Sequence, residues 1–433
     1  MSSLQDRSRQ FLWHPCTQMK NLETVPPLAI ARGEGAWLFD DAGNRYVDAI
    51  SSWWVNLFGH ANPRINAAII DQLEKIEHVM LAGCTHEPVV ELSERLSNLT
   101  GLGHAFYASD GASATEIALK MSFHYWRNTG QAGKTQFISL QNGYHGETLG
   151  ALSVTDVALF KDQYAPLLRH SVQMPSPDIR LVEAGESDET FAIRCSEALE
   201  TYLQQHAETI AAFILEPLVQ GAAGMAMYHP IYLSRARELC TKYQVHLVAD
   251  EIAVGFGRTG TMFACEQADI RLDFMCLSKG ITGGYLPLSC VLTTDEVFAA
   301  FYADETSKGF LHSHSYTGNP LACRAALAVL DIFEQDKVIE ANRVRAERFS
   351  ALLEPVRHHR RVEHFRNLGM IWAFDVQNVT PGFSTRAYQA ALKAGVLLRP
   401  IGNTVYLMPP YVVGEDEMVK MAMAAQLILD EIK

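Results

Sequence analysis

Residues 245–280 read VHLVADEIAVGFGRTGTMFACEQADIRLDFMCLSKG and contain two short apolar segments, each followed by a charged residue. The first segment, 245–249, leads into Asp250, and the second, 274–278, leads into Lys279. Short continuous apolar segments are typical of strands that are covered on both faces, as in a parallel sheet. The stretch therefore predicts an α/β fold in which a carboxylate and an amine reach the same edge of one sheet.

A carboxylate and an amine at the carboxyl edge of a sheet suit the chemistry of pyridoxal 5'-phosphate (PLP), because ligands of α/β proteins bind at this edge. Lys279 would form a Schiff base with the PLP aldehyde, and Asp250 would keep the pyridine nitrogen protonated. The alternative is an ordinary surface ion pair, which is common for Asp and Lys at strand ends. The apolar residues before both side chains weigh against it, because a buried unpaired charge is costly.

Composition restricts the class of protein. The chain has 433 residues, 48% of them hydrophobic, which is enough for a large core and two or three domain-sized parts. The net charge of -13 gives no basic surface for nucleic acid or an anionic membrane. The 8 cysteines include no C-x-x-C pair, the first residues are polar, and no apolar run approaches the ~20 residues of a membrane span. We expect a cytoplasmic protein that acts on small molecules.

The pattern of the chain changes twice. Residues 1–60 mix short strand-like pieces with turn signals, and residues 61–330 alternate helical patterns with short apolar strands. Residues 331–433 read as a smaller α+β domain. The middle part carries the α/β pattern and should hold the site.

A candidate phosphate site follows the expected strand 104–108. The turn after it contains Gly111 and Ala112, and a helix should begin at Ser113, where Ser113 and Glu116 match a capping box. Free backbone N–H groups and the helix dipole converge at such a point, and small residues let a phosphate approach. Many turns of this kind bind nothing, so the signal is moderate alone.

Two further strand ends carry candidate site residues. Tyr144 lies in a glycine-flanked loop after strand 136–140 and could stack on a planar ring, or be an ordinary packed tyrosine. Strand 211–215 delivers Glu216 to the same edge. Residues 145–147 match half of a zinc deaminase motif, but no P-C-x-x-C follows, and we expect no metal site.

Aromatic and basic residues elsewhere suggest a binding pocket. Trp53 and Trp54 could line an apolar pocket, or belong to the core or a subunit interface. The loop 312–318 before a helix capped by Asn319 suits a second phosphate contact or a plain surface loop. Arg399 follows an apolar strand and is either a carboxylate receptor or part of an internal salt bridge.

Taken in order, these motifs resemble the class III (ω-type) aminotransferases of PLP fold type I over nearly the whole chain. The matching motifs are Gly111-Ala112, Tyr144-His145-Gly146, Glu216-Pro217, Asp250-Glu251-Ile252, Gly255-Phe256-Gly257-Arg258, Ser278-Lys279 and Gly318-Asn319-Pro320-Leu321-Ala322. Further motifs are similar to those of members that convert 8-amino-7-oxononanoate to 7,8-diaminononanoate with S-adenosylmethionine as amino donor, in biotin biosynthesis. These are Trp13-His14-Pro15, Ser51-Ser52-Trp53-Trp54, Val219-Gln220-Gly221, Met227-Tyr228-His229-Pro230, Arg399-Pro400 and Tyr406-Leu407-Met408-Pro409-Pro410-Tyr411.

The resemblance implies a homodimer with active sites between the subunits. Each subunit would have a large PLP-binding domain, 61–330, with a mainly parallel sheet, and a small α+β domain formed by 1–60 and 331–433. Position by position, Lys279 would be the Schiff-base lysine and proton shuttle, and Asp250 the partner of the pyridinium. The remaining cofactor contacts that the resemblance implies are Tyr144 near the ring, Gly111 and Ala112 at the phosphate, and His314 and Ser315 reaching that phosphate from the other subunit.

The resemblance also implies a set of substrate contacts. Trp53 would line the substrate channel together with Tyr144, Ser313 would lie at the substrate, and Arg399 would hold the carboxylate of the oxo-acid. Arg258 would contribute to binding of the amino donor. Three positions depart from the family pattern: Cys16 replaces a usual tyrosine, Ala112 a serine, and Ser315 a threonine. Cys16 would face the substrate with a smaller, weaker donor.

Other functions are compatible with parts of this pattern. Another class III ω-aminotransferase could act on a diamine or an ω-amino acid, or the same reaction could use lysine as donor. A PLP-sensing regulator would need an added basic DNA-binding domain, which we do not expect here. The paired tryptophans and the apolar setting of Arg399 favour a long, mostly aliphatic acid as substrate.

Overall fold

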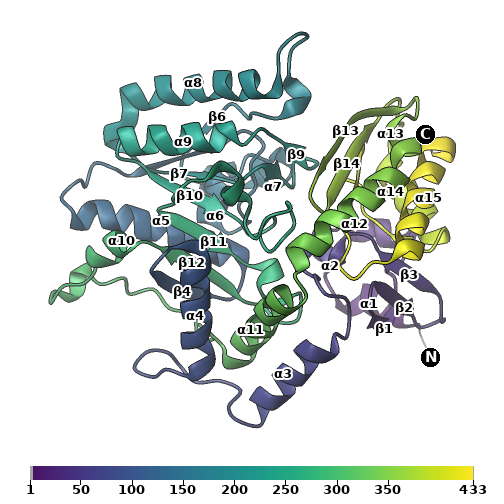
Figure 1. The fold of residues 1–433 in the computed structure, drawn as a ribbon, viewed down its shortest axis with the longest axis horizontal. Coiled ribbons are helices and arrows are strands. Elements are labelled where there is room, and N and C mark those ends of the chain that lie inside the picture. Colours follow the sequence, from purple (N-terminus) through teal and green to yellow (C-terminus); the bar gives the residue numbers. More distant parts are fainter. Residues whose placement is uncertain (1–2, 433) are drawn as a thin grey trace.

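A seven-stranded sheet forms the centre of the computed structural model, which describes residues 3–432 (Figure 1). Its strands, in spatial order, are β4 (His104–Ala108), β12 (Ser289–Thr293), β11 (Phe274–Leu277), β10 (His246–Asp250), β7 (Ile210–Leu215), β5 (Gln136–Leu140) and β6 (Val172–Met174). Every neighbouring pair is parallel except the two pairs that β12 forms. The predicted α/β class with a mainly parallel sheet is confirmed.

The central strands are buried on both faces. Along β10, Val248 packs into one apolar cluster, whereas its neighbours Leu247 and Ala249 pack into the other. Helix α5 (Gly111–Asn128) supplies much of the first cluster. Helices α8 (Asp188–His206) and α9 (Ile231–Lys242) run side by side along the other face (Figure 1). Covering both faces explains why these strands are continuously apolar in sequence.

Helix α5 begins two residues earlier than expected. Asp110 is its N-cap, and its carboxylate accepts the N–H of Ser113 at 2.9 Å. Glu116 caps another helix: it accepts the N–H groups of Gly150 at 2.8 Å and Ala151 at 3.1 Å, at the start of α6 (Leu149–Val154). The predicted Ser113–Glu116 capping box is therefore wrong, because an aspartate two positions before Ala112 already satisfies the first turn.

The two ends of the chain share one sheet. Strands β1 (Ile30–Glu34), β2 (Trp37–Asp40) and β3 (Arg45–Asp48) are joined by β15 (Val396–Leu397), which pairs parallel with β3. A second sheet contains β13 (Val362–Leu368), β14 (Ile371–Val376) and β16 (Thr404–Leu407). Figure 1 shows both sheets on one side of the molecule, with helix α15 (Glu415–Glu431) against them. We therefore propose a small domain made of residues 1–60 and 331–433, beside a large domain of 61–330.

The structure also contains further α-helices and a short hairpin outside these three sheets. They are α1 (Leu4–Phe11), α2 (Ser51–Trp54), α3 (Pro63–Leu73), α4 (Glu87–Thr100), α7 (Ala158–Lys161), α10 (Asp295–Ala299), α11 (Pro320–Gln335), α12 (Val338–Leu352), α13 (Glu354–Arg357), α14 (Phe383–Lys393) and the short hairpin β8 (Val219–Gln220) and β9 (Ala226–Met227). Asn319 caps α11 as predicted, by accepting the N–H of Ala322 at 3.1 Å. Within residues 3–432, no helix has the length and apolar character needed to cross a membrane.

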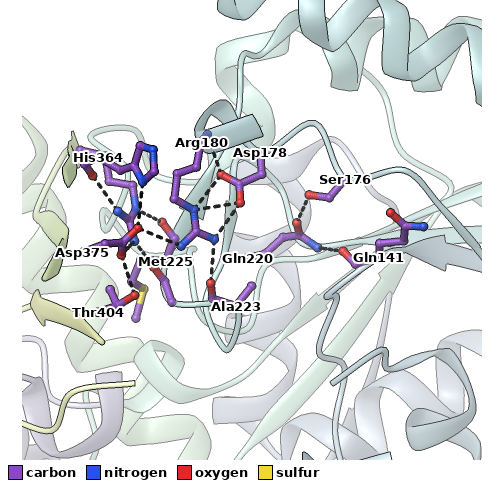
Figure 2. A network of polar contacts seen from close by, with 12 residues as sticks. Gln141, Ser176, Asp178, Arg180, Gln220, Ala223, Met225, His364, Asp375 and Thr404 are labelled. Carbon is purple, nitrogen blue, oxygen red and sulfur yellow. Dashed lines mark hydrogen bonds and ion pairs between the residues drawn. The ribbon is translucent and has the colours of Figure 1, made fainter. Parts of the chain in front are cut away.

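A network of charged side chains joins the small sheets to the central part of the chain (Figure 2). Arg180 donates to both carboxylate oxygens of Asp178 at 2.7 to 3.0 Å, and it contacts Asp375 of β14 at 3.5 Å. Arg366 of β13 donates to Asp375 at 3.1 Å and to the carbonyl of Met225 at 2.8 Å. Because most of these groups are buried and paired, they fix the small sheets in one orientation beside the central part of the chain.

Candidate active site

Three ionisable side chains meet where neighbouring strands end. Asp250 is the last residue of β10, Glu216 follows β7, and Lys279 follows β11. Because β10 lies between β7 and β11, the structure places these residues together at the carboxyl edge of the sheet. Both carboxylates are buried, with 4% of each residue exposed.

The Oδ2 atom of Asp250 contacts a buried hydrogen-bond donor. His145 Nδ1 lies 2.7 Å from Asp250 Oδ2 and donates to it, and the N–H of Ile252 donates to Oδ1 at 3.1 Å. Both contacts fix the orientation of the carboxylate. The other ring nitrogen of His145, Nε2, is buried and has no hydrogen-bond partner within residues 3–432. The pair offers a fixed negative charge next to an unused polar atom, as expected of a site built for a further group.

Glu216 holds the loop that carries Tyr144. Its carboxylate accepts the N–H of Tyr144 and the N–H of Gly221, each at 2.9 Å. Burial raises the pKa of Glu216 to about 7, and the nearby Asp250 adds to the increase, although these N–H contacts oppose it. Near neutral pH this carboxyl is therefore close to its titration midpoint, while its two hydrogen bonds fix the backbone of the loop.

Lys279 has a strained backbone and a desolvated amine. Its φ is 46°, in the left-handed region, two residues after the end of β11. Its Nζ lies 5.0 Å from the centroid of the Trp54 ring. Burial lowers the pKa of Lys279, and the charges of Asp250 and Glu216 only partly offset this effect. A lysine with a lowered pKa is more often neutral, which is the form that attacks a carbonyl or accepts a proton.

Two tryptophans link Lys279 to the arginine of the small domain. All four residues of α2, Ser51–Trp54, have positive φ values, 50°, 46°, 71° and 73°, so the segment is a left-handed turn. Trp54 is buried, and its Nε1–H donates to the hydroxyl of Tyr406 at 3.1 Å. Trp53 is 44% exposed, and its ring centroid lies 4.8 Å from the guanidinium carbon of Arg399. One turn thus presents one ring to the amine of Lys279 and the other to the guanidinium of Arg399.

Arg399 lines a pocket between the N-terminal segment 17–53 and the C-terminal segment 384–406. The pocket has a volume of about 560 Å³, and its lining includes Trp53, Leu22, Tyr388 and Arg399. The guanidinium is exposed, and its Nη2 donates to the carbonyl of Cys16 at 3.0 Å. Cys16 itself is exposed and has a φ of 48°. A stacked, accessible guanidinium at an apolar pocket can receive a carboxylate.

Tyr144 lies close to the same edge of the sheet. Its hydroxyl donates to Glu147 Oε1 at 2.9 Å, and its ring makes an edge contact with Phe160 at 5.6 Å between centroids. Burial and the charge of Glu147 raise the pKa of Tyr144 well above its ordinary value. The phenol therefore remains protonated and can donate a hydrogen bond throughout the neutral range.

Gly111 and Ala112 form the first turn of α5, where N–H groups face the end of the sheet. Both are tightly surrounded. A Cβ at Gly111 would lie 3.1 Å from side-chain atoms of Ile252, and one at Gly146 would lie 2.6 Å from the Cβ of Ala112. Only small residues allow the helix N-terminus, the 144–147 loop and Ile252 to approach this closely.

The loop with Ser313, His314 and Ser315 lies outside this cluster in the single chain. Both serines are exposed, and His314 Nε2 contacts His312 Nε2 at 2.8 Å. The main-chain N–H of His314 donates to Thr317 at 3.2 Å. A contact of this loop with a phosphate across a subunit boundary therefore stays a prediction.

Arg258 occupies a different environment from the one that the sequence suggests. It is 1% exposed, and its guanidinium donates to the carbonyls of Pro409 at 2.8 Å, Asn56 at 3.1 Å and Trp54 at 3.3 Å. A buried guanidinium needs such acceptors, because its donors have no water. The structure places Arg258 behind the left-handed turn, and any influence on the amino donor would act through that turn.

Sequence reasoning missed two residues of the site. His145 belongs to half of a zinc motif and to the family motif Tyr144-His145-Gly146, but neither gave a sign that its ring would contact Asp250. Trp54 was grouped with Trp53, without a sign that it would face Lys279. Groups of three or more His, Cys, Asp or Glu side chains arranged to hold a metal ion are absent from residues 3–432.

The side chains present fit PLP. The amine of Lys279 matches its aldehyde, the carboxyl group of Asp250 matches its pyridine nitrogen, and the N-terminus of α5 matches its phosphate. The unpartnered Nε2 of His145 and the close packing around Gly111 indicate a site shaped for a bound group. The fold and these residues together define a PLP-dependent α/β enzyme.

Comparisons with known proteins identify the family. The model of the family "Aminotransferase class-III" matches residues 18–429. An adenosylmethionine-8-amino-7-oxononanoate aminotransferase of Helicobacter pylori is 47% identical, with 98% of this chain and 97% of that protein covered. The crystal structure of the enzyme of that name from Methanocaldococcus jannaschii has a TM-score of 0.93 at 37% identity, covering 99% of each chain. An amine transaminase from an uncultivated Pseudomonas species, solved in its PLP-bound form, has a TM-score of 0.91 at 33% identity, covering 98% of this chain and 99% of that one. The chain belongs to the class III aminotransferase family.

Proposed function

We propose that this aminotransferase transfers the amino group of S-adenosylmethionine to 8-amino-7-oxononanoate and forms 7,8-diaminononanoate, a step of biotin biosynthesis. Relatives that are 47% and 42% identical over 98% and 96% of this chain bear the name of that reaction. The degree of identity and its extent over the chain support carrying the reaction over to this protein.

The observation that carries the proposal is the pair of rings on the left-handed turn. The Trp54 ring lies 5.0 Å from the amine of Lys279, and the Trp53 ring lies 4.8 Å from the guanidinium of Arg399. The acceptor has a ketone and a carboxylate separated by a long aliphatic chain. An apolar surface with an amine at one end and a guanidinium at the other suits such a molecule, because it satisfies the carboxylate and covers the methylene groups.

The cofactor of this reaction is PLP, which supplies an electron-accepting ring and an aldehyde that carries the amino group between donor and acceptor. Lys279 would hold it and move a proton at the reacting carbon, a task that suits an amine with a lowered pKa. Asp250 would hold the ring nitrogen, with His145 orienting that carboxylate. Tyr144 would lie against the ring and the substrate.

The phosphate would lie at Gly111 and Ala112, with His314 and Ser315 of a second subunit completing its contacts in a homodimer. At the substrate, Trp53 and Arg399 would be joined by Cys16, Tyr144, Ser313 and, through the turn, Arg258. The carbonyl of Cys16 already accepts a hydrogen bond from Arg399, which supports its place near the carboxylate end. A cytoplasmic location is part of the same proposal.

The first test follows the donor half-reaction alone. Purified protein loaded with PLP is mixed with S-adenosylmethionine, and the visible absorbance of the bound cofactor is recorded. We expect this absorbance to fall without any acceptor present. Lysine, a diamine and an ω-amino acid are compared at equal concentration. A loss of absorbance with lysine but not with S-adenosylmethionine would mean that lysine is the donor. A loss only with the diamine or the ω-amino acid would refute the proposed function in favour of another ω-aminotransferase.

The second test identifies the product. S-adenosylmethionine and 8-amino-7-oxononanoate are incubated with the enzyme, and mass spectrometry is used to detect the diamino acid. The Lys279→Ala protein is the control for reaction in the absence of enzyme catalysis. A wild-type protein that consumes the donor and aminates other ketones, but forms no 7,8-diaminononanoate, would refute the acceptor.

A further inference from the structure

The left-handed turn Ser51–Trp54 is unusual because none of its residues is glycine. All four φ values are positive, between 46° and 73°. L-residues are disfavoured in this region, because the Cβ approaches the following carbonyl oxygen. Such a segment persists only where the surrounding structure determines it. The contacts that determine it also determine where the Trp53 and Trp54 rings lie.

The buried carboxylate of Asp48 makes the main contacts to this turn. Asp48 Oδ1 accepts the N–H of Ser52 at 2.9 Å, and Oδ2 accepts the hydroxyl of Ser52 at 2.7 Å. Asp48 is fully buried, and its own N–H donates to the carbonyl of Ala36 at 2.8 Å, so its position is fixed by the sheet. Both hydrogen bonds reach the same residue, whose φ is 46°, the lowest of the four.

A histidine holds the carboxylate from the other side. His60 Nε2 lies 3.1 Å from Asp48 Oδ2, and His60 Nδ1 lies 3.1 Å from the side-chain amide of Asn56. The main-chain carbonyl of Asn56 in turn accepts from the buried Arg258 at 3.1 Å. Hydrogen bonds therefore hold the turn on both sides, through Asp48 before it and through Asn56 after it.

We propose that Asp48 is a positioning residue of the acceptor site. It does not face the pocket, but it keeps Ser52 in the left-handed conformation and so sets the Trp53 ring against Arg399 and the Trp54 ring against Lys279. The inference rests on the proposed function, because it assigns to these rings the aliphatic acid that the reaction consumes. Removing the carboxylate should impair acceptor binding more than it impairs folding.

Three holoenzyme variants test the proposal. Asp48→Asn keeps the size of the side chain but replaces one carboxylate oxygen by an NH2 group, which cannot accept a hydrogen bond. In the wild type Oδ2 contacts two donors, the Ser52 hydroxyl and His60. Ser52→Gly and Ser52→Ala are then added separately to Asp48→Asn. Both additions remove the same hydroxyl, but only glycine adopts a positive φ without steric conflict. Asp40→Asn is the matched control, because Asp40 also caps a turn in this sheet, through the N–H of Asn44 at 2.7 Å, and it touches neither ring.

We expect Asp48→Asn to raise the KM for 8-amino-7-oxononanoate about tenfold, with a smaller change in kcat. Adding Ser52→Gly should recover at least threefold of that loss, whereas Ser52→Ala should recover none. Near-ultraviolet circular dichroism should show an altered tryptophan signal in Asp48→Asn and a signal closer to the wild type after Ser52→Gly. Asp40→Asn should lower Tm without changing the KM or the tryptophan signal.

Two results would overturn the proposal. The first is an Asp48→Asn protein that loses Tm like Asp40→Asn but keeps the wild-type KM and tryptophan signal. The second is equal behaviour of the glycine and alanine variants. If Asp48→Asn does not fold, the single variants Ser52→Gly and Ser52→Ala decide in the same way. Failure of the proposed function is recognised separately, because then the wild type itself does not aminate 8-amino-7-oxononanoate, while the circular dichroism comparison still tests the turn.

Discussion

Replacing Arg399 by alanine should damage the second half-reaction more than the first. The guanidinium is exposed in the free protein, where it contacts the carbonyl of Cys16 and the ring of Trp53. Its removal should therefore leave the fold nearly unchanged. The carboxylate of the oxo-acid would lose its charged partner and would still be drawn from water by the apolar pocket around it.

The size of the effect follows from the interaction that is lost. A hydrogen bond to a charged group contributes about 1.5–3 kcal/mol. Since about 1.4 kcal/mol corresponds to a factor of ten, the specificity constant for the acceptor should fall roughly tenfold to hundredfold. Arg399→Lys keeps the charge but loses the planar fork and much of the stacking on Trp53, so its loss should lie near the lower value.

The two half-reactions can be measured apart through the absorbance of the bound cofactor, first with S-adenosylmethionine and then with 8-amino-7-oxononanoate. Arg32→Ala is a matched control, because Arg32 is also an exposed arginine stacked on a ring, 3.5 Å above Phe39, and lies on strand β1. Equal losses in both half-reactions would mean that Arg399 also receives the carboxylate of the donor. An unchanged acceptor half-reaction would refute the assignment.

Substitutions at four further residues test other parts of the site and the core. Lys279→Ala should abolish transamination, because both the exchange of amino groups and the proton transfer need one basic amine at the reacting atoms; multiple turnovers by the pure variant would contradict this. Asp250→Asn should lower the single-turnover rate severely with little change in far-ultraviolet circular dichroism, since a neutral amide cannot hold the ring nitrogen protonated. Cys16→Ser should be mild and Cys16→Tyr should change acceptor binding, whereas wild-type kinetics of both variants for donor and acceptor would place Cys16 away from the substrate. Burial raises the pKa of Glu251 from 4.5 to about 7, so the folded chain holds a proton that the unfolded chain has released. The free energy of unfolding should then fall by up to about 3 kcal/mol as pH rises through this window, and Glu251→Gln should flatten that slope in urea unfolding at pH values on either side.

The central sheet could be predicted from sequence because its signal is local. The segments 104–108 and 136–140 are strands with the predicted bounds. The strand predicted at 245–249 is observed one residue later, at 246–250, and the one predicted at 274–278 ends one residue earlier, at 277. Burial on both faces demands continuous apolar runs, and each run stops where a polar group must reach the site. The meeting of Asp250 and Lys279 at one edge follows from the parallel order of their strands.

The partners of these residues could not be predicted in the same way. His145 reaches Asp250 from 105 positions away, and Arg258 finds acceptors at Trp54 and Pro409, which lie 204 and 151 positions from it. No periodicity or local motif records which strand end faces which loop. Arg258 illustrates the consequence: the resemblance implies a contribution to binding of the amino donor, and only the structure shows that its guanidinium donates to main-chain carbonyls.

The left-handed turn Ser51–Trp54 is the clearest case in which residue preferences predict the wrong backbone conformation. Two serines and two tryptophans carry no glycine signal, and residue preferences alone would place all four at negative φ. The conformation is imposed by groups that the sequence scatters, namely the carboxylate of Asp48, the carbonyl of Met408, which accepts the Ser51 hydroxyl at 2.7 Å, and the hydroxyl of Tyr406. Strain of this kind persists because these contacts, and not the residues of the turn themselves, determine the backbone. The left-handed conformation sets the direction of both side chains, so that the Trp54 ring lies against the amine of Lys279 and the neighbouring Trp53 ring lies against the guanidinium of Arg399.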